Sequence, residues 1–436
     1  MTPPAGVRGV ADLISGENFA TGSSVDTLRV RDAKDVEEVV RAAIANEQPL
    51  EIIGHGSKRQ IGQLMATNAV LDVSALNAVT SYEPNELIIT VQAGAPLADV
   101  MSLIDAKNQQ FAFEPMSTAA LLGIPGGGTI GGMIAAGLAG PRRMRAGGAR
   151  DHLLGAHAVS GFGDSFKAGG RVVKNVTGYD LCKLLAGSWG TLAVMTEVTL
   201  KVMPRPESER TLLLRGLGDI AANKAMTAAL GSPFDVSGAA HLPKSAFRAK
   251  NAGLGEIASQ DAALTLLRLE GITASVVHRA ASLRDLLAPY GAVVVVEDAA
   301  SSELWAAIRD VLPFAADGAL GAWPVWRIVC PPAAGGALGQ QLARETGGDV
   351  LYDWGGGLIW AALPPNADAQ AATLRRRAEA VGGHAMLVRA SEETRREVEV
   401  FHPQPAGVAA LSERVRLSFD PKSILNRGRL QRGGVA

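Results

Sequence analysis

The sequence Gly126-Gly127-Gly128-Thr129-Ile130-Gly131-Gly132 begins the glycine clusters of a stretch that extends from Glu114 to Pro206. This stretch continues through Arg171-Val172-Val173-Lys174-Asn175-Val176-Thr177-Gly178-Tyr179-Asp180 and closes on Gly187-Ser188-Trp189-Gly190-Thr191-Leu192. Glycine is dense where a backbone must lie close to another group or take a positive φ. Because apolar, strand-like segments separate the clusters, the pattern favours a backbone cradle around a long ligand over a single tight turn.

The bulk composition excludes several classes of protein. A chain of 436 residues is long enough for two or more structural units. Hydrophobic residues make up 47% and charged residues 19%, which excludes a disordered protein. The formal net charge of -1 gives no electrostatic reason to expect nucleic acid. The N-terminus lacks a signal peptide pattern and no apolar run is long enough for a membrane helix, so we expect a cytoplasmic protein, peripheral to the inner membrane only through partners.

The two cysteines, Cys182 and Cys330, are far apart and neither belongs to a CxxC pair. A disulfide framework is therefore excluded. A cysteine-ligated iron–sulfur cluster needs about four thiolates, so this chain cannot hold one alone. The histidines show no metal-ligand spacing, and we predict no metal site.

The periodicity along the chain predicts an α+β fold. Strands are expected at 25–30, 50–53, 70–73 and 88–91, a helix capped by Asp32 from about 33 to 47, and a second helix from 97 to about 107. A hairpin is expected over 153–173, and a strand over 192–202 whose even-numbered residues share one face. Pro204 and Pro206 end this strand and mark a boundary after residue 206. Residues 207–395 show two similar strand–helix–strand patterns, which predict one sheet with helices on one face.

Gly126, Gly128 and Gly131 match the spacing of the dinucleotide-binding fingerprint, but their context does not. That fingerprint needs a strand before the glycines and a helix of several turns after them. Pro125 interrupts the preceding segment, and Gly137 ends any helix after about two turns. A nicotinamide cofactor is therefore not predicted.

Two glycine loops together suggest a site for a diphosphate. Gly54-His55-Gly56-Ser57-Lys58 and Gly128-Thr129-Ile130-Gly131-Gly132 each end a short element, where backbone amides can be exposed. Two facing loops and Lys58 could neutralise the anionic oxygens of a diphosphate. The alternative is that each loop is only a turn.

At this point the sequence resembles the PCMH-type FAD-binding domain of the vanillyl-alcohol oxidase superfamily. The resemblance is carried by 54–62, 91–97, 129–132, 150–155 and 187–192. More narrowly, 137–143, 173–181, 353–356, 382–385 and 419–429 are similar to the FAD-binding subunits of bacterial glycolate oxidases. The resemblance covers nearly the whole chain, with the motifs in order.

This resemblance implies a two-subdomain FAD-binding domain at 1–206, an α+β, ferredoxin-like cap domain at 207–395, and a C-terminal segment, 396–436, that returns to the FAD domain. It implies that FAD contacts Gly54, His55, Gly56, Ser57, Lys58, Pro115, Gly128, Thr129, Gly131, Gly132, Gly147, Gly190, Thr191, Val194, Asn426 and Arg429. The family's C-terminal turn is usually Asn-Pro-Gly-Arg; here it is Asn426-Arg427-Gly428-Arg429, without the proline. The position of the histidine that often carries covalent flavin is Gly56, so we predict non-covalent FAD.

The resemblance also implies the function: an FAD-binding subunit of a glycolate oxidase (2-hydroxy-acid dehydrogenase) complex. Glycolate would be oxidised to glyoxylate, and electrons would pass through the flavin to an iron–sulfur partner beside a second, catalytic FAD subunit. Two alternatives are a self-sufficient FAD-dependent hydroxy-acid or alcohol oxidoreductase and a non-catalytic assembly subunit with a vestigial FAD site. The catalytic residue is not identified by the sequence; the candidates are Lys174, Tyr179 and His384.

Overall fold

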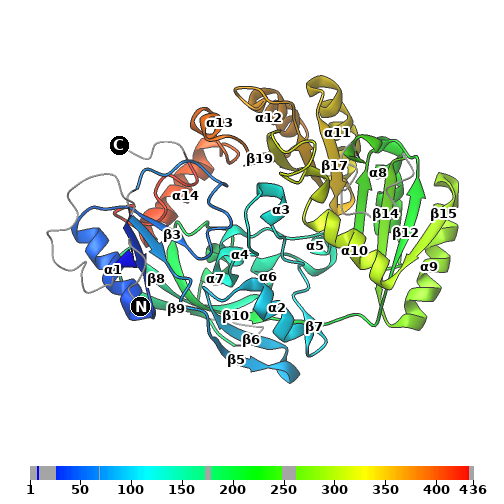
Figure 1. The fold of residues 1–436 in the computed structure, drawn as a ribbon. Coiled ribbons are helices and arrows are strands. Elements are labelled where there is room, and N and C mark those ends of the chain that lie inside the picture. Colours follow the sequence, from blue (N-terminus) through cyan, green and yellow to red (C-terminus); the bar gives the residue numbers. More distant parts are fainter. Residues whose placement is uncertain (1–6, 9–25, 68, 172–177, 248–261, 432–436) are drawn as a thin grey trace.

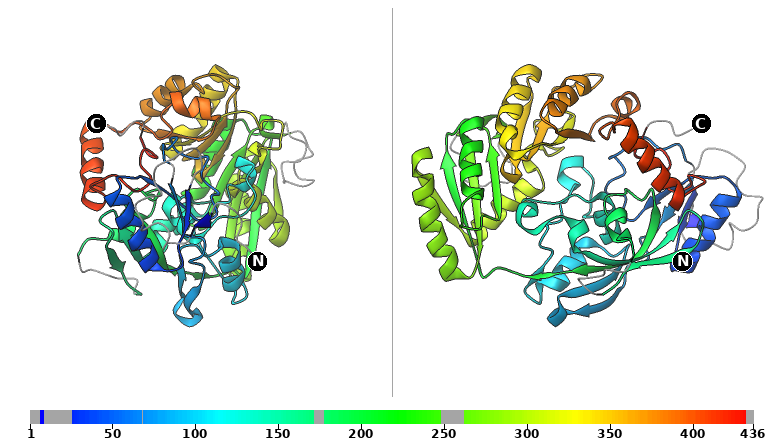
Figure 2. Two further views of the ribbon diagram at one scale, coloured as in Figure 1. Left: turned by 60° about the vertical axis from the view of Figure 1, so that its left-hand side comes forward. Right: turned by 180° about the vertical axis from the view of Figure 1, so that it is seen from behind.

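The computed structural model describes residues 7–8, 26–67, 69–171, 178–247 and 262–431 (Figure 1). The N-terminal half of the chain and its C-terminal segment lie together, and the strands of residues 208–389 form a second part beside them (Figures 1 and 2). We call these parts the FAD half and the cap. The domain boundaries at 206 and 395 stay a prediction. Within the described ranges, no helix has the length and apolar character needed to cross a bilayer.

A small parallel sheet forms one side of the FAD half. Its strand order is β1 (Val7–Arg8), β2 (Asp26–Arg29), β4 (Ala69–Asp72) and β3 (Leu50–Ile53). Helix α1 (Ala33–Ala45) buries Val36, Val39, Val40 and Ala43. Asp32 caps this helix as predicted, because its carboxylate accepts the backbone N–H groups of Lys34 and Asp35.

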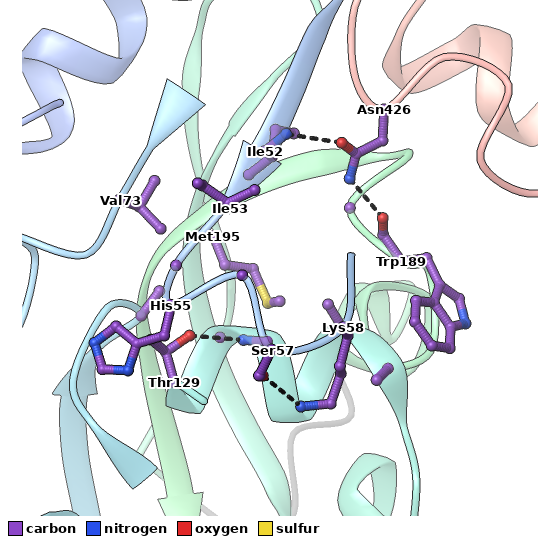
Figure 3. Close-up of a pocket in the computed structure, with 18 of the residues that line it drawn as sticks. Ile52, Ile53, His55, Ser57, Lys58, Val73, Thr129, Trp189, Met195 and Asn426 are labelled. Atoms are coloured by element: carbon purple, nitrogen blue, oxygen red, sulfur yellow. Dashed lines mark hydrogen bonds between the residues drawn. The ribbon is translucent and has the colours of Figure 1, made fainter. Parts of the chain in front are cut away.

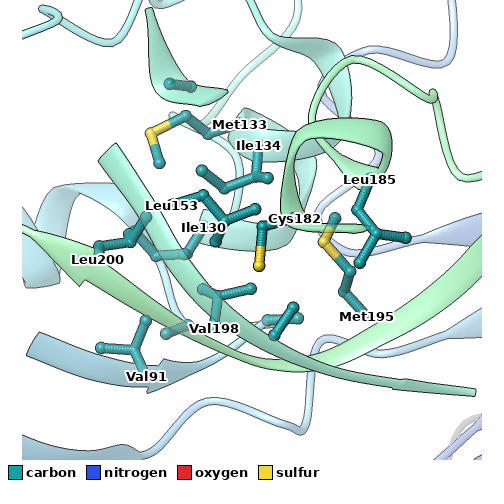
Figure 4. Close-up of a cluster of buried hydrophobic side chains, with 14 of the residues drawn as sticks. Val91, Ile130, Met133, Ile134, Leu153, Cys182, Leu185, Met195, Val198 and Leu200 are labelled. Atoms are coloured by element: carbon teal, nitrogen blue, oxygen red, sulfur yellow. The ribbon is translucent and has the colours of Figure 1, made fainter. Parts of the chain in front are cut away.

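An antiparallel sheet forms the other side of the FAD half. Its order is β5 (Val79–Glu83), β6 (Ile88–Gln92), β10 (Ala193–Lys201), β8 (Leu153–Ser160) and β9 (Ser165–Gly169). Short helices pack against it around the apolar core of Figure 4. They include α2 (Leu97–Asp105), α4 (Ile130–Ala136), α6 (Ala149–His152) and α7 (Leu181–Leu185). Smaller elements nearby are η2 (Pro84–Glu86), β7 (Gln109–Gln110), α3 (Ala119–Leu122), α5 (Arg143–Ala146) and β11 (Met203–Pro204).

Strand β10 does not keep the strict alternation that its sequence predicts. A bulge between Met195 and Glu197 inserts Thr196 as an extra residue in the pairing with β8. Before the bulge, Met195 faces the core of the antiparallel sheet and Val194 faces the core under the parallel sheet. After it, Val198 faces the antiparallel core. The prediction that Val194 and Val198 share one face was therefore wrong, because the extra residue exchanges the two faces.

The cap is built from two β-α-β-β-α-β units, which confirms the ferredoxin-like prediction. The first unit runs through β12 (Ser208–Arg215), α8 (Asp219–Leu230), β13 (Gly238–Leu242), β14 (Leu264–Gly271), α9 (Thr273–Leu287) and β15 (Val293–Glu297). The second runs through β16 (Val325–Val329), α11 (Pro332–Thr346), β17 (Asp349–Asp353), β18 (Leu358–Ala362), α12 (Ala371–Ala380) and β19 (His384–Arg389). The combined order β15-β12-β14-β13-β17-β18-β16-β19 shows that the units join edge to edge through β13 and β17.

Helices cover both faces of the cap sheet, not one face as predicted. Helices α8 and α9 pack on Leu212 and Leu214 of β12, whereas α10 (Asp298–Arg309) places Trp305 against Leu213 on the opposite face. The sequence pattern of α10 was missed. Among the described residues, no such helix covers the same face of the second unit; residues of this face, such as Leu358, pack against the FAD half. Short 3₁₀ turns complete the cap: η3 (Lys244–Phe247), η5 (Ala288–Tyr290), η6 (Leu312–Phe314) and η7 (Trp354–Gly356).

The C-terminal segment returns to the parallel sheet. After α13 (Glu392–Glu397) and α14 (Ala406–Phe419), Leu425 forms a parallel bridge with Leu50 of β3. Asp420 is fully buried, and its carboxylate accepts the backbone N–H groups of Ile424 at 2.9 Å and Leu425 at 2.8 Å. This segment is thereby fixed at the edge of β3, next to the loop that follows the strand.

Buried ion pairs join the cap to the FAD half. Arg268 of β14 donates to both oxygens of Glu114, at 2.8 and 2.9 Å, and lies 3.3 Å from Glu270. Arg142 of the FAD half donates to Glu270 at 2.9 Å. Burial opposes ionisation of Glu270, but the charges of Arg268 and Arg142 outweigh it and hold the pKa of this carboxyl at about 2. The positive charges likewise lower the pKa of Glu114, so both carboxyl groups remain ionised near neutral pH.

Removing Arg268 should strongly destabilise the protein. Arg268→Met leaves Glu114 and Glu270 buried with less positive charge, and breaking such a pair costs about 3–5 kcal/mol. The free energy of unfolding by urea measures this. Arg210→Met is the matched control, since Arg210 and Glu297 pair at 2.8 Å nearer the surface, and its loss should cost less than about 1 kcal/mol. Equal stability of the two variants would contradict the assignment.

Candidate functional site

The two predicted glycine loops line one pocket of the FAD half (Figure 3). The pocket is open and has about 730 Å³ of empty space. The first loop follows β3 and the second leads into α4, so the pocket lies between the parallel and antiparallel sheets. Its lining includes the predicted residues Gly54, His55, Gly56, Ser57, Lys58, Thr129, Gly131, Gly132, Gly190, Asn426 and Arg429.

The loops are so close that side chains would not fit at two of their glycines. A Cβ at Gly54 would lie 2.5 Å from the Thr129 hydroxyl oxygen. A Cβ at Gly128, where φ is +81°, would lie 2.6 Å from the Ser57 hydroxyl oxygen and 3.3 Å from the Lys58 nitrogen. The glycines are thus required by the contact between the loops, in addition to the positive φ at Gly128.

The two loops differ in the hydrogen bonding of their backbone. In the first loop, the N–H groups of residues 54–58 have no acceptor among the described residues. In the second, Ile130 and Gly131 donate to the carbonyls of Ala95 and Ala93, and Gly132 donates to the Thr129 hydroxyl. The prediction that the second loop exposes its amides is therefore wrong for 130–132. These amides fasten α4 to the sheet, and the first loop supplies most of the unused donors.

Lys58 adds a positive charge to the pocket. It is half-buried, and its ammonium is 3.4 Å from the Ser57 hydroxyl. No carboxylate of the described residues pairs with it, and burial lowers the pKa of Lys58 to about 8. A half-buried ammonium without a carboxylate partner, beside a row of unused N–H groups, fits the diphosphate of a dinucleotide.

Asn426 and Arg429 hold the first loop in place. The Asn426 amide accepts the Ile52 N–H at 2.8 Å and donates to the Trp189 carbonyl at 2.7 Å (Figure 3). Arg429 donates to the Lys58 carbonyl at 2.5 Å. The turn closes without the family's proline, because the Arg429 N–H donates to the Asn426 carbonyl at 3.1 Å. Gly428, with φ of +82°, provides the positive φ of a type II turn.

Other predicted residues lie outside the lining of this pocket. Val194 is buried in the neighbouring core because of the β10 bulge, and Ala193 and Met195 line the pocket instead. Thr191 is buried and donates to the Ser188 carbonyl at 2.8 Å. Pro115 bridges to Ala139, and Gly147 ends α5 with φ of +78°. Their role toward FAD stays a prediction.

The two catalytic candidates that the structure describes lie in different halves of the molecule. Lys174 lies outside the described residues. The Tyr179 side chain is 94% exposed. His384 begins β19 in the cap, and its ring centroid is 6.3 Å from that of His402. Burial, and then the charge of Arg327, lower the pKa of His384, so its imidazole is neutral at pH 7.

Sequence reasoning missed most of the apolar lining. Trp189 and Ala193 belong to the segment 187–194, which the resemblance places beside FAD, but the pocket is also lined by Ile52, Ile53, Val73, Ala93, Ala135, Ala136 and Met195. They come from β3, β10, α4 and the loops between, and an apolar surface of this kind suits flat aromatic rings. In the sequence these residues have the pattern of an ordinary core, so no signal separated them from it.

Comparison with known proteins establishes the family. The FAD binding domain family matches residues 27–169. Glycolate oxidase subunit GlcE of Escherichia coli (strain K12) is 31% identical over 398 residues, which are 90% of this chain and 95% of that protein. This chain belongs to the GlcE family. It is an FAD-dependent oxidoreductase by family, and FAD is its cofactor.

Further relatives match a part of the chain or the fold alone. Glycolate oxidase subunit GlcD of Bacillus subtilis (strain 168) is 32% identical over 184 residues, 41% of the GlcE-family chain and 38% of that protein. The structure of 4-ethylphenol oxidase from Gulosibacter chungangensis has a TM-score of 0.68 at 14% identity and covers 95% of this chain and 91% of its own. The structure of p-cresol methylhydroxylase has a TM-score of 0.64 at 14% identity. The match covers 93% of this chain and 88% of that protein's chain. These structures confirm the PCMH-type fold.

Gly54→Ala should weaken FAD binding by forcing the loops apart. The new methyl group would meet Thr129, whose hydroxyl is held as the cap of α4. Overpacking costs about 1–3 kcal/mol, which corresponds to roughly a 5- to 150-fold loss of affinity. Gly127→Ala is the matched control, since a Cβ there meets nothing within 4 Å. Titration of the FAD-free protein with FAD measures the affinity of each variant. Equal affinities of Gly54→Ala and Gly127→Ala would contradict this explanation.

The affinity for FAD should fall as the pH rises through about 8, where Lys58 of the FAD-free protein loses its proton. Lys58→Met should bind FAD roughly tenfold to a hundredfold more weakly at neutral pH and lose this pH dependence. Without FAD, the folded pKa lies below the ordinary 10.5 of lysine, so Lys58 makes stability rise with pH between about 8 and 10.5. The control is Lys167→Met, an exposed lysine of β9. An unchanged pH profile in Lys58→Met would refute the assignment.

Proposed function

We propose that this chain is the FAD-carrying subunit of a complex that oxidises glycolate, or a similarly small 2-hydroxy acid, to the 2-keto acid. Electrons then pass to an iron–sulfur partner, beside a second FAD subunit related to GlcD. The proposal rests most directly on the pocket in which both glycine loops, Lys58 and Asn426 meet. It is supported by the 31% identity to a glycolate oxidase subunit over 90% of the chain.

The reaction class sets what the protein must provide. A 2-hydroxy acid loses two electrons and two protons when it becomes a 2-keto acid. FAD, when bound, supplies the acceptor for the two electrons. The first loop and Lys58 would hold the diphosphate, and Trp189 and Met195 would border the aromatic rings. Non-covalent attachment follows from Gly56, which has no side chain to bond to the flavin.

The cysteines support the need for an electron-accepting partner. Cys182 lies in the core of the antiparallel sheet and Cys330 in the core of the second cap unit. Burial raises the pKa of each thiol to about 11. Two separate, protonated thiols cannot provide the roughly four thiolates of an iron–sulfur cluster. The alternative, a self-sufficient hydroxy-acid oxidoreductase, is favoured only by neutral His384 as a proton acceptor.

Purification of the chain alone and with its co-expressed partner subunits tests the proposal. The chain alone should be yellow, release intact FAD when denatured in acid, and oxidise glycolate slowly. The complex should oxidise glycolate at least tenfold faster per flavin. Flavin absorbance is followed while glycolate is added without oxygen. Loss of the flavin absorbance shows that glycolate reduces the flavin, whereas an unchanged absorbance shows that the flavin is bound but not reduced.

Three outcomes would contradict the proposal. Fast turnover by the isolated chain would favour the self-sufficient enzyme. A colourless chain that still assembles with partners would favour the assembly subunit. Flavin that stays attached to the denatured chain would show that the attachment is covalent.

A further inference from the structure

Two arginines stack on one tryptophan where the cap meets the FAD half. The guanidinium carbon of Arg143, from α5, lies 4.6 Å from the ring centroid of Trp354. That of Arg327, from β16, lies 5.0 Å from the same centroid. Trp354 is 3% exposed, and its ring N–H donates to the Gly140 carbonyl at 3.0 Å, so the aromatic surface is fixed.

Both arginines lack an acceptor. Neither guanidinium makes a hydrogen bond or ion pair with another residue in the part of the chain that the structure describes. Their neighbours are different: Arg142 pairs with Glu270 and Arg309 pairs with Asp310, at 2.5 and 2.7 Å. The unused donors are therefore specific to Arg143 and Arg327, not common to every arginine of this junction.

The nearest carboxyl group does not neutralise the pair. Asp353 attracts Arg327, but the two side chains form no ion pair. Instead, one carboxylate oxygen of Asp353 accepts the backbone N–H of Trp354 at 2.7 Å. Burial raises the pKa of Asp353 to about 7, so part of the population is uncharged at neutral pH. Burial, and then the charge of Arg143, lower the pKa of Arg327 to about 10. His384, also near Arg327, is neutral and brings no negative charge.

The tryptophan under the two arginines belongs to an apolar cluster that extends to the FAD pocket. Trp354 belongs to the same apolar cluster as Ala136 and Trp189, and both of these line the pocket. Arg327 pairs across the sheet with Trp360, which belongs to this cluster, so β16 presents Arg327 on the side of the FAD half. The free donors therefore lie at the junction of the two halves, beside the apolar cluster that also lines the pocket.

We propose that Arg143 and Arg327 form a carboxylate clamp, one arginine from each half of the molecule, that binds the acid group of the substrate. This inference rests on the proposed function and adds the residues that select an acid over an alcohol. Two planar guanidinium forks match the two oxygens of a carboxylate, and the anion offsets the repulsion between the like charges. Trp354 holds both forks in position before the substrate arrives.

Calorimetric titration of the FAD-loaded full chain, and of its complex with co-purified partners, tests the clamp. The probes are glycolate and oxalate, with glycolamide as the uncharged analogue. The wild type should bind the two acids and bind glycolamide at least tenfold more weakly. Arg143→Met and Arg327→Met should each bind the acids about tenfold to a hundredfold more weakly, with glycolamide unchanged.

Arg145→Met is the matched control. Arg145 is on the same helix, α5, but it is 61% exposed and pairs with Asp235 at 2.7 Å, so its loss should leave acid binding unchanged. Retained flavin absorbance and an unchanged thermal midpoint show that each variant is folded. Because Arg143 is exposed, its variant tests the clamp even if Arg327→Met does not fold.

Each other outcome has a definite meaning. Failure of the wild type to bind acids, or equal binding by all variants, overturns the clamp. Loss of partner subunits from the clamp variants without loss of acid binding shows that the arginines bind a partner's carboxylate, which also overturns it. Acids could bind in a way that depends on both arginines while no 2-hydroxy acid reduces the flavin. This result would support the clamp and contradict the proposed function.

Discussion

The contact between the loop after β3 and the loop before α4 is the constraint on which the candidate site depends. Gly54 and Thr129 approach so closely that even a methyl group would not fit. This approach brings the end of a parallel strand and the start of a helix from the antiparallel layer to one pocket. The two loops then have different roles. The backbone amides of 130–132 anchor α4, and those of 54–58 remain available to bind the cofactor. The cofactor site is thus one loop with unused backbone N–H groups, held against a second loop whose N–H groups at 130–132 already have acceptors.

Two sets of long-range contacts maintain this arrangement. Asn426, far along the chain, joins β3 to the turn at Trp189, and Arg429 fixes the first loop through the Lys58 carbonyl. The ion pairs of Arg268 with Glu114 attach the cap to the FAD half. These interactions explain why a site built on short N-terminal loops needs both the cap and the C-terminal segment. They also place the stacked arginines at a junction whose geometry is fixed from both halves.

Local chemistry allowed much of this to be predicted. The Asp32 cap, the strand at 50–53 and the two glycine loops depend on neighbours in sequence, and the resemblance supplied the cofactor and the fold. Features set by distant partners were not predictable. The bulge at Thr196 is visible only once β10 pairs with β8, and it moved Val194 out of the pocket. The amides of Ile130 and Gly131 find their acceptors on a segment more than thirty residues away. The face covered by α10 depends on packing that periodicity alone does not reveal.

Hydrogen–deuterium exchange with and without FAD tests the central claim most directly, because it reports on the backbone amides themselves. The account predicts that the amides of residues 54–58 exchange rapidly in the FAD-free protein and become protected when FAD binds. The amides of 130–132 should be protected in both states, since they already have acceptors. Tight FAD binding with no change in the exchange of 54–58 would contradict the account.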